Sequence, residues 1–176
     1  MSKTATLISN ENDSFEVSFE KVFASAMVKS VIDPEYGDDL CEEEEDTQVP
    51  LPMISTPILR KIVDYMNHYG LNLPQIVTPL RFKDMAKNVG EWECNFLDME
   101  RDELMELLRA ADYMDMGGLI LLCSAKLANN IMGMSTEEMR EYLGIVNDFT
   151  PEEEVELKKE LEWTNDVFKR EEGELE

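Results

Sequence analysis

The chain has 176 residues, enough for one ordinary domain with an appendage, and 43% of them are hydrophobic, which is sufficient for a buried core. Its 39 acidic residues against 16 basic ones give a formal net charge of −23. Because this charge repels phosphate groups, the composition disfavours nucleic acids and anionic membranes as partners.

Cysteine usage and apolar runs indicate the compartment. Cys41, Cys94 and Cys123 are scattered, with neither the even count of a disulfide framework nor the spacing of a zinc site. The N-terminus lacks the apolar segment of a signal peptide, and no run approaches the roughly 18 apolar residues that span a membrane. We therefore expect a reducing compartment, cytoplasm and nucleus, and no membrane insertion.

The first third of the chain predicts a small sheet. Residues 4–9 and 14–19 have strand character, with a polar turn between them, and residues 19–32 follow with apolar positions at helical spacing. An acidic loop at about 33–48 comes next and is typical of a solvated segment. Residues 48–54 then resume an extended course, and their two prolines favour an edge strand.

Helices are predicted from Ser55 onward. Residues 55–69 form an amphipathic helix, whereas residues 70–90 contain two prolines and predict an irregular loop with at most a short helical turn. Residues 101–114 are again helical. Residues 117–132 are apolar nearly all round at their start, which predicts the most buried helix.

Two further helices close the chain. One opens at Ser135, with Glu138 completing a capping box, and the other opens at Thr150, with Glu153 placed to complete a second capping box. On the terminal helix apolar side chains cover an arc of about 160°, wider than a surface helix normally buries. They form two edges, one of Leu157, Leu161 and Phe168 and the other of Trp163 and Val167. The element order predicts an α+β fold, a small sheet overlaid by helices, with the last two helices as an appendage.

The sequence shows no catalytic signature. It has no glycine-rich phosphate loop, and its single histidine, His68, has no orienting partner and is expected to be a surface or packing residue. The acidic run does not follow the ligand spacing of a calcium loop. We expect no catalytic residue, no metal and no cofactor, although an acidic enzyme or calcium-binding protein with an unseen motif remains an alternative.

Several stretches together resemble the S-phase-kinase-associated adaptor family, the small subunits of Skp–cullin–F-box ubiquitin ligases. They are "VPLPMISTPILRKIVDYM", the span from "EWECNFLDME" to "REYLGI", and "NDFTPEEEVELKKELEW", in the family's order and spacing. The resemblance runs from about Ala5 to Trp163. It implies a BTB/POZ-type fold over residues 3–128, F-box-binding helices over 129–168 and an acidic tail over 169–176.

The resemblance also implies two contact surfaces. Tyr113 matches a family tyrosine that packs on a cullin, while Asp112 stands where the family usually has asparagine. The implied F-box contacts are Met105, Ile120, Leu127, Ile131, Met139, Ile145, Phe149, Leu157 and Trp163. The same residues could instead be ordinary core, with both edges of the terminal helix packed on the chain itself.

The chain departs from the family pattern at several positions. Gly117, Met132 and Met134 replace lysines, and Leu121 stands where an acidic residue is common. The loop from Gly70 lacks the family's acidic, proline-dense run. These changes are expected to retune partner choice, since methionine adapts to irregular surfaces.

The resemblance implies a non-enzymatic adaptor. It would bridge a cullin scaffold, and through it a RING subunit, to F-box proteins that select substrates for ubiquitin-dependent degradation. The alternatives are an elongin-C-like adaptor of another ligase, which would lack the tail after about Asn129, and a self-assembling BTB scaffold. A weak homodimer is a possible state of the unpartnered chain.

Overall fold

The computed structural model describes residues 3–32, 46–80 and 82–172, except for the side chains of residue 46 and of residues 162–172. Most of the predicted acidic loop, Cys41 and part of the predicted acidic tail therefore lie outside the described residues. The chain divides into two compact units, Met1–Met132 and Gly133–Glu176. The domain boundaries taken from the resemblance remain predictions; helix α7 (Gly117–Ile131) runs through the one expected after residue 128.

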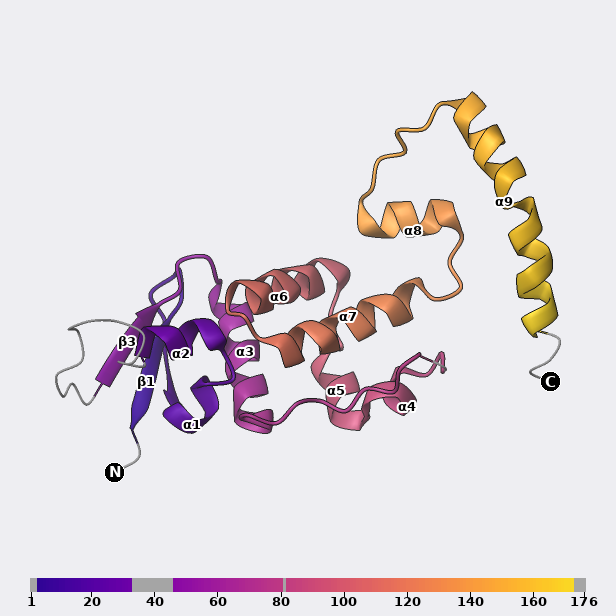
Figure 1. Ribbon diagram of the computed structural model, residues 1–176. Coiled ribbons are helices and arrows are strands. Elements are labelled where there is room, and N and C mark those ends of the chain that lie inside the picture. Colours follow the sequence, from indigo (N-terminus) through magenta and orange to yellow (C-terminus); the bar gives the residue numbers. More distant parts are fainter. Residues whose placement is uncertain (1–2, 33–45, 81, 173–176) are drawn as a thin grey trace. The chain divides into compact units, whose positions relative to one another are not determined.

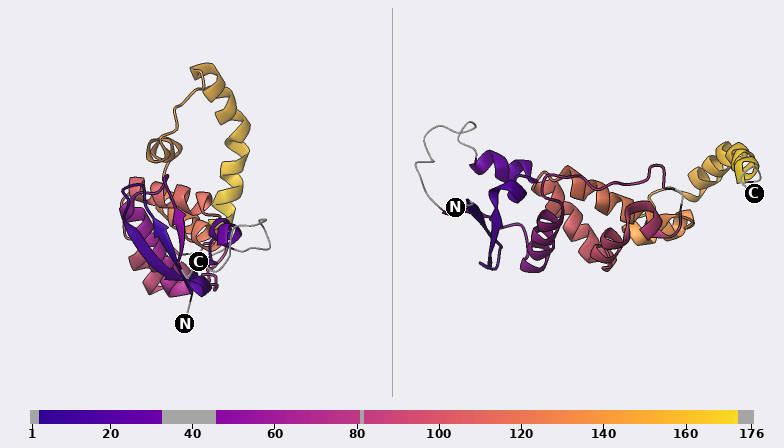
Figure 2. Two further views of the ribbon diagram at one scale, coloured as in Figure 1. Left: turned by 90° about the vertical axis from the view of Figure 1, so that its left-hand side faces the viewer. Right: turned by 90° about the horizontal axis from the view of Figure 1, so that it is seen from below.

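A three-stranded sheet lies at one end of unit 1 (Figures 1 and 2). Strand β1 (Thr4–Ile8) is central, antiparallel to β2 (Ser14–Ser18) and parallel to β3 (Asp46–Pro50). Alternate residues of these strands are buried, Leu7 and Val49 among them, so the sheet has one face in the core. β3 is an edge strand, as its prolines predict.

The helix predicted over 19–32 is interrupted. α1 (Phe19–Val22) and α2 (Ala26–Ile32) are separated by a turn at Ser25. The buried Ser25 hydroxyl donates to the carbonyl of Met114 and accepts from the backbone N–H of Val28. A serine side chain that satisfies the first turn of a new helix competes with continuing the old one, and the sequence pattern did not reveal this tertiary bond.

Three longer helices complete the core of unit 1: α3 (Thr56–Tyr69), α6 (Arg101–Tyr113) and α7. α6 packs against both α3 and α7. The predicted apolar face of α3 is confirmed. The prediction that α7 is the most buried helix is wrong, because α3 buries seven of its 14 residues and α7 only five of 15. An apolar helix at the margin of the unit leaves one side uncovered.

The loop after α3 carries two short helices, α4 (Met85–Val89) and α5 (Glu91–Phe96). The sequence pattern allowed one short turn and missed α5. The ring of His68 stacks on Trp92 at 3.6 Å, and Trp92 stacks in turn on Phe96 at 4.9 Å. His68 is thus a packing residue, as expected, and this aromatic stack attaches α5 to the end of α3.

The start of α7 depends on a close approach. A Cβ added at Gly118 would meet the Tyr65 hydroxyl, and would lie 3.0 Å from Leu73 and 3.1 Å from Pro74. Nothing lies within 4 Å of a Cβ added at Gly117. Only the second glycine is therefore required by packing.

We predict that Gly118→Ala lowers the free energy of unfolding of unit 1 by about 1–3 kcal/mol, the range for overpacking a filled core. Gly117→Ala is the matched control and should be neutral or slightly stabilising. Urea unfolding followed by Trp92 fluorescence measures both. Equal stability of the two variants would show that the contact relaxes without cost.

Candidate functional site

The described residues offer no metal cluster, and one of their two free cysteines, Cys123, is buried. No group of three or more His, Cys, Asp or Glu side chains in the described ranges could hold a metal ion. Burial raises the pKa of the Cys123 thiol to about 12, so it stays protonated. A search of the same residues finds no helix with the length and apolar character to cross a membrane.

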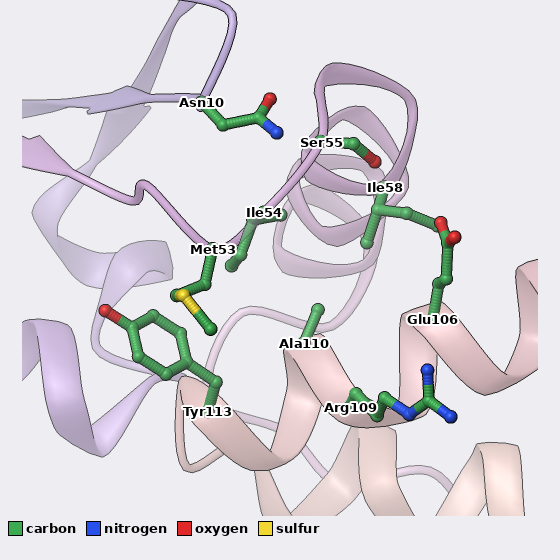
Figure 3. A pocket seen from close by; sticks show the side chains of 9 residues that line it. All are labelled: Asn10, Met53, Ile54, Ser55, Ile58, Glu106, Arg109, Ala110 and Tyr113. Carbon is green, nitrogen blue, oxygen red and sulfur yellow. The ribbon is translucent and has the colours of Figure 1, made fainter.

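A pocket of about 360 Å³ opens beside the C-terminal end of α6 (Figure 3). The Tyr113 ring and the Met53 side chain line it, and Asn10, from the turn between β1 and β2, contributes an amide. Tyr113 is 43% exposed and Met53 77%. Two large, accessible side chains beside a cavity with polar groups at its margin suit contact with an amphipathic partner.

Two of the side chains that line this pocket carry opposite charges. Glu106 and Arg109 project from α6 on the side of the pocket away from Tyr113 (Figure 3). Asp112 is exposed one residue before Tyr113. A carboxylate accepts hydrogen bonds but donates none, so Asp112 places a negative charge where an asparagine would supply a donor.

The turn that carries Asn10 is fixed to the start of α3. The Asn10 backbone N–H donates to the carbonyl of Ile54 at 3.0 Å. The Ser9 and Thr56 hydroxyls are hydrogen-bonded at 2.8 Å, and the Thr56 hydroxyl also bonds the Asp13 carboxylate at 2.9 Å. Sequence reasoning missed this network. It fixes the wall of the pocket opposite α6.

Four of the implied F-box contacts lie in unit 1. Met105 is on α6, and Ile120, Leu127 and Ile131 are on α7; all four are half-buried. At about 100° per residue the three α7 positions share one face. This face borders the buried side of the helix, where Leu119, Leu122 and Cys123 lie.

Unit 2 holds the remaining implied contacts. α8 (Thr136–Leu143) contains no buried residue, and Met139 on it is half-buried. The following residues Ile145 and Phe149 are 55% and 46% exposed, and Leu157 on α9 (Pro151–Glu172) is 37% exposed. The backbone at Trp163 is helical, but its side chain lies outside the described residues. The described part of unit 2 thus buries none of its own apolar side chains.

A polar cluster that sequence reasoning missed joins the end of α8 to the start of α9. The Asn147 side-chain amide donates to the Glu154 carboxylate at 2.6 Å, and the Arg140 guanidinium lies 3.7 Å from the same carboxylate. Arg140 also lies 5.8 Å from the centre of the Phe149 ring, within cation–π range. These contacts order the connector and hold Phe149 close to Arg140.

Both helices of unit 2 begin with a capping box. At α8 the Ser135 hydroxyl accepts from the Glu138 backbone N–H, and the Glu138 carboxylate accepts in return. At α9 the Glu153 carboxylate accepts from the backbone N–H of Thr150 at 2.8 Å and from its hydroxyl at 2.9 Å. Both boxes confirm the sequence prediction.

The α9 cap predicts a pH dependence. The hydrogen bonds from Thr150 lower the pKa of Glu153. Because the folded-state pKa lies below the unfolded one, the cap's contribution is present above the unfolded pKa. It is lost as the pH falls through the folded pKa. Thr150→Val removes the hydroxyl and keeps the backbone N–H, so it should raise the Glu153 pKa part of the way toward its ordinary value, as measured by carboxyl-carbon NMR of the intact chain. An unchanged pKa in Thr150→Val would show that the hydroxyl takes no part in the box.

Comparison with known proteins places the chain in a family. The family model "Skp1 family, tetramerisation domain" matches residues 3–70, and "Skp1 family, dimerisation domain" matches residues 117–164. An S-phase kinase-associated protein 1 homolog of Tetrahymena thermophila is 32% identical over 163 residues, which are 92% of this chain and 93% of that protein.

Two fungal relatives give the same result. The chain is similar to E3 ubiquitin ligase complex SCF subunit sconC of Aspergillus terreus, at 29% identity over 94% of this chain and all of that protein. The subunit of the same name from Aspergillus clavatus is 30% identical, with the same coverage. These matches support the BTB/POZ-type α+β fold expected from the sequence. The chain belongs to the Skp1 family.

Proposed function

We propose that this protein is a non-enzymatic adaptor subunit of an SCF ubiquitin ligase. The support is twofold. Relatives that align over more than nine-tenths of the chain are named as SCF subunits. The described residues also expose large apolar side chains in two places, beside the Tyr113 pocket and along unit 2. Cytoplasm and nucleus, the reducing compartments that the cysteine usage favours, are the proposed compartments.

The observation that carries the proposal is the uncovered apolar surface of unit 2. Ile145, Phe149 and Leu157 are each more than one-third exposed, and none of the described side chains of unit 2 is fully buried. Helices that leave an apolar face open are suited to enclose the helices of another polypeptide. We propose that the F-box of a substrate receptor fills this surface, together with Met105 and the α7 face of Ile120, Leu127 and Ile131.

The cullin would bind at the pocket beside Tyr113. Tyrosine and methionine are well suited to a contact centre, because each offers a large apolar area. Asp112 beside them sets a negative charge at this proposed interface. The cullin in turn would hold the RING subunit, so the adaptor's role is to bring a selected substrate near the ubiquitin-loaded enzyme. The rate gain would come from proximity, without bond chemistry in this chain.

Two alternatives from the sequence are weighed against the same observations. An elongin-C-like adaptor would end before unit 2, yet residues up to 164 match the family. The descriptions of the two matched family models contain the words "dimerisation domain" and "tetramerisation domain", which support a self-assembling scaffold. The net charge of −23 opposes association between copies. We therefore favour the adaptor.

For the F-box surface, we predict that the double variant Phe149→Ala/Leu157→Ala binds a purified F-box domain at least about tenfold more weakly, since each truncation at a contact centre typically costs more than 1 kcal/mol. Isothermal titration calorimetry measures the affinity. Val31→Ala, which truncates an apolar side chain of similar exposure in α2, is the control. Unchanged affinity in the double variant would refute the F-box surface.

For the cullin surface, Tyr113→Ala should abolish or strongly weaken binding to a purified cullin N-terminal domain and leave F-box binding unchanged. Asp112→Asn should strengthen cullin binding severalfold, because it removes a charge and adds a donor. Surface plasmon resonance with each partner separates the two effects. Loss of both partners in Tyr113→Ala, with unfolding excluded by circular dichroism, would argue against independent surfaces.

A further inference from the structure

A strip of surface without carboxylates crosses unit 1 of this strongly acidic protein. Residues 71–83 and 116–132 contain no Asp or Glu, although 39 of the 176 residues, more than one in five, are acidic. The first segment is the loop after α3, and the second contains α7. The two segments are far apart in the sequence, and the fold brings them side by side.

The loop runs alongside α7 at both ends of the helix. Near the helix start, Leu73 and Pro74 approach Gly118. About three turns later, the side-chain amide of Asn129 donates to the carbonyl of Lys83 at 3.4 Å. Helix α4, which follows the loop, also packs on α7. The two acid-free segments therefore form one continuous surface.

This surface exposes apolar side chains along its whole length. Leu73 is 68% exposed, and Val77 and Phe82 are 43% and 44% exposed. On α7, Leu121 is 57% exposed. By helical spacing, the exposed edge of Gly117, Leu121 and Ser124 lies between the loop and the face that carries Ile120, Leu127 and Ile131. The strip thus adjoins the proposed F-box surface.

Phe82 is held outward by a buried side chain. The Asn88 amide, 1% exposed, donates to the Phe82 carbonyl at 2.6 Å and accepts from the Phe82 backbone N–H at 3.3 Å. An asparagine that satisfies both backbone groups of one residue fixes that residue without enclosing its ring. The exposure of Phe82 is therefore set by the fold.

The end of the strip is basic. Lys83 is exposed, and the Lys87 ammonium lies 6.0 Å from the centre of the Phe82 ring. Asp84, which caps α4, lies 3.8 Å from Lys87 and offsets part of this charge. An aromatic ring with one lysine over it and a second exposed lysine next to it in the chain favours a ligand that combines carboxylates with apolar side chains. The charge complementarity thus selects an acidic, apolar segment.

We propose that the strip, defined as residues 71–80, Phe82 and Lys83 with Gly117, Leu121, Ser124 and Lys87, binds an acidic segment with apolar side chains that flanks the F-box of the substrate receptor. This inference rests on the proposed function for the identity of the partner. Three departures from the family pattern fall on the strip: Gly117, Leu121 and the loop without its acidic run. The surface would therefore give this chain its own preference among receptors.

The first test uses a short fluorescein-labelled peptide of alternating acidic and leucine or phenylalanine residues, titrated with the intact chain and followed by fluorescence anisotropy. Lys83→Glu/Lys87→Glu and, separately, Leu121→Glu should each weaken binding about tenfold. Lys3→Glu/Lys29→Glu, an equal charge change at exposed positions elsewhere in unit 1, should change it less than twofold. Thermal unfolding verifies that every variant is folded.

Several outcomes would overturn the proposal. No peptide binding, or equal weakening by both lysine pairs, would show that the strip is not a site. Sedimentation velocity could show that the chain self-associates with rising concentration and that Lys83→Glu/Lys87→Glu abolishes this association. A second copy of the chain would then be the ligand of the strip.

A second test separates this inference from the proposed function. Lys83→Glu/Lys87→Glu should bind a receptor that carries an acidic flank more weakly than the wild-type chain does. The same variant should bind the bare F-box domain as tightly as the wild-type chain does. If the bare domain binds and the flank adds nothing, the strip proposal fails alone. If neither receptor form binds the wild-type chain, the proposed function fails. The receptor is then also excluded as the ligand of the strip.

Discussion

Unit 1 buries its apolar side chains far more completely than the described part of unit 2 does, and the other features of the structure depend on this difference. Unit 1 closes a core in which the sheet and helices α3, α6 and α7 contribute fully buried residues. Unit 2 comprises only residues 133–176, and two helices joined by a short connector cannot surround an apolar centre. Because burial of apolar surface is the main favourable contribution to folding, a unit that leaves such surface in water gains stability by binding another chain.

Polar contacts in unit 2 accordingly serve to shape the chain. Capping boxes start both helices, and the cluster of Arg140, Asn147 and Glu154 orders the connector between them. Exposed contacts of this kind contribute little to stability individually. Their effect is to restrict the conformations from which a partner would be bound, which lowers the entropic cost of ordering on association.

The surfaces of unit 1 follow from its packing in a similar way. The hydrogen bonds of Ser9, Thr56 and Asp13 fix the turn that faces Tyr113, and the buried Asn88 fixes Phe82. In the first place hydrogen-bonded polar side chains fix the pocket wall opposite an exposed tyrosine, and in the second they fix the backbone of an exposed phenylalanine. Rigid presentation of an aromatic side chain is a common property of strong contact sites, since little side-chain entropy remains to be lost.

Local patterns in the sequence determined much of this protein: the strands at 4–8 and 14–18, the proline-marked edge strand, the apolar face of α3 and both capping boxes. These features depend on the chemistry of residues close together in the chain. The break at Ser25, helix α5, the uncovered side of α7 and the network around Asn10 were decided by tertiary structure, because each depends on partners distant in sequence, such as Met114 for Ser25 and Thr56 for Ser9. The acid-free strip depends on both the local sequence and the tertiary structure. Its two segments are visible in the sequence, but only packing brings Leu73 to Gly118 and Lys83 to Asn129, and so makes one surface of them.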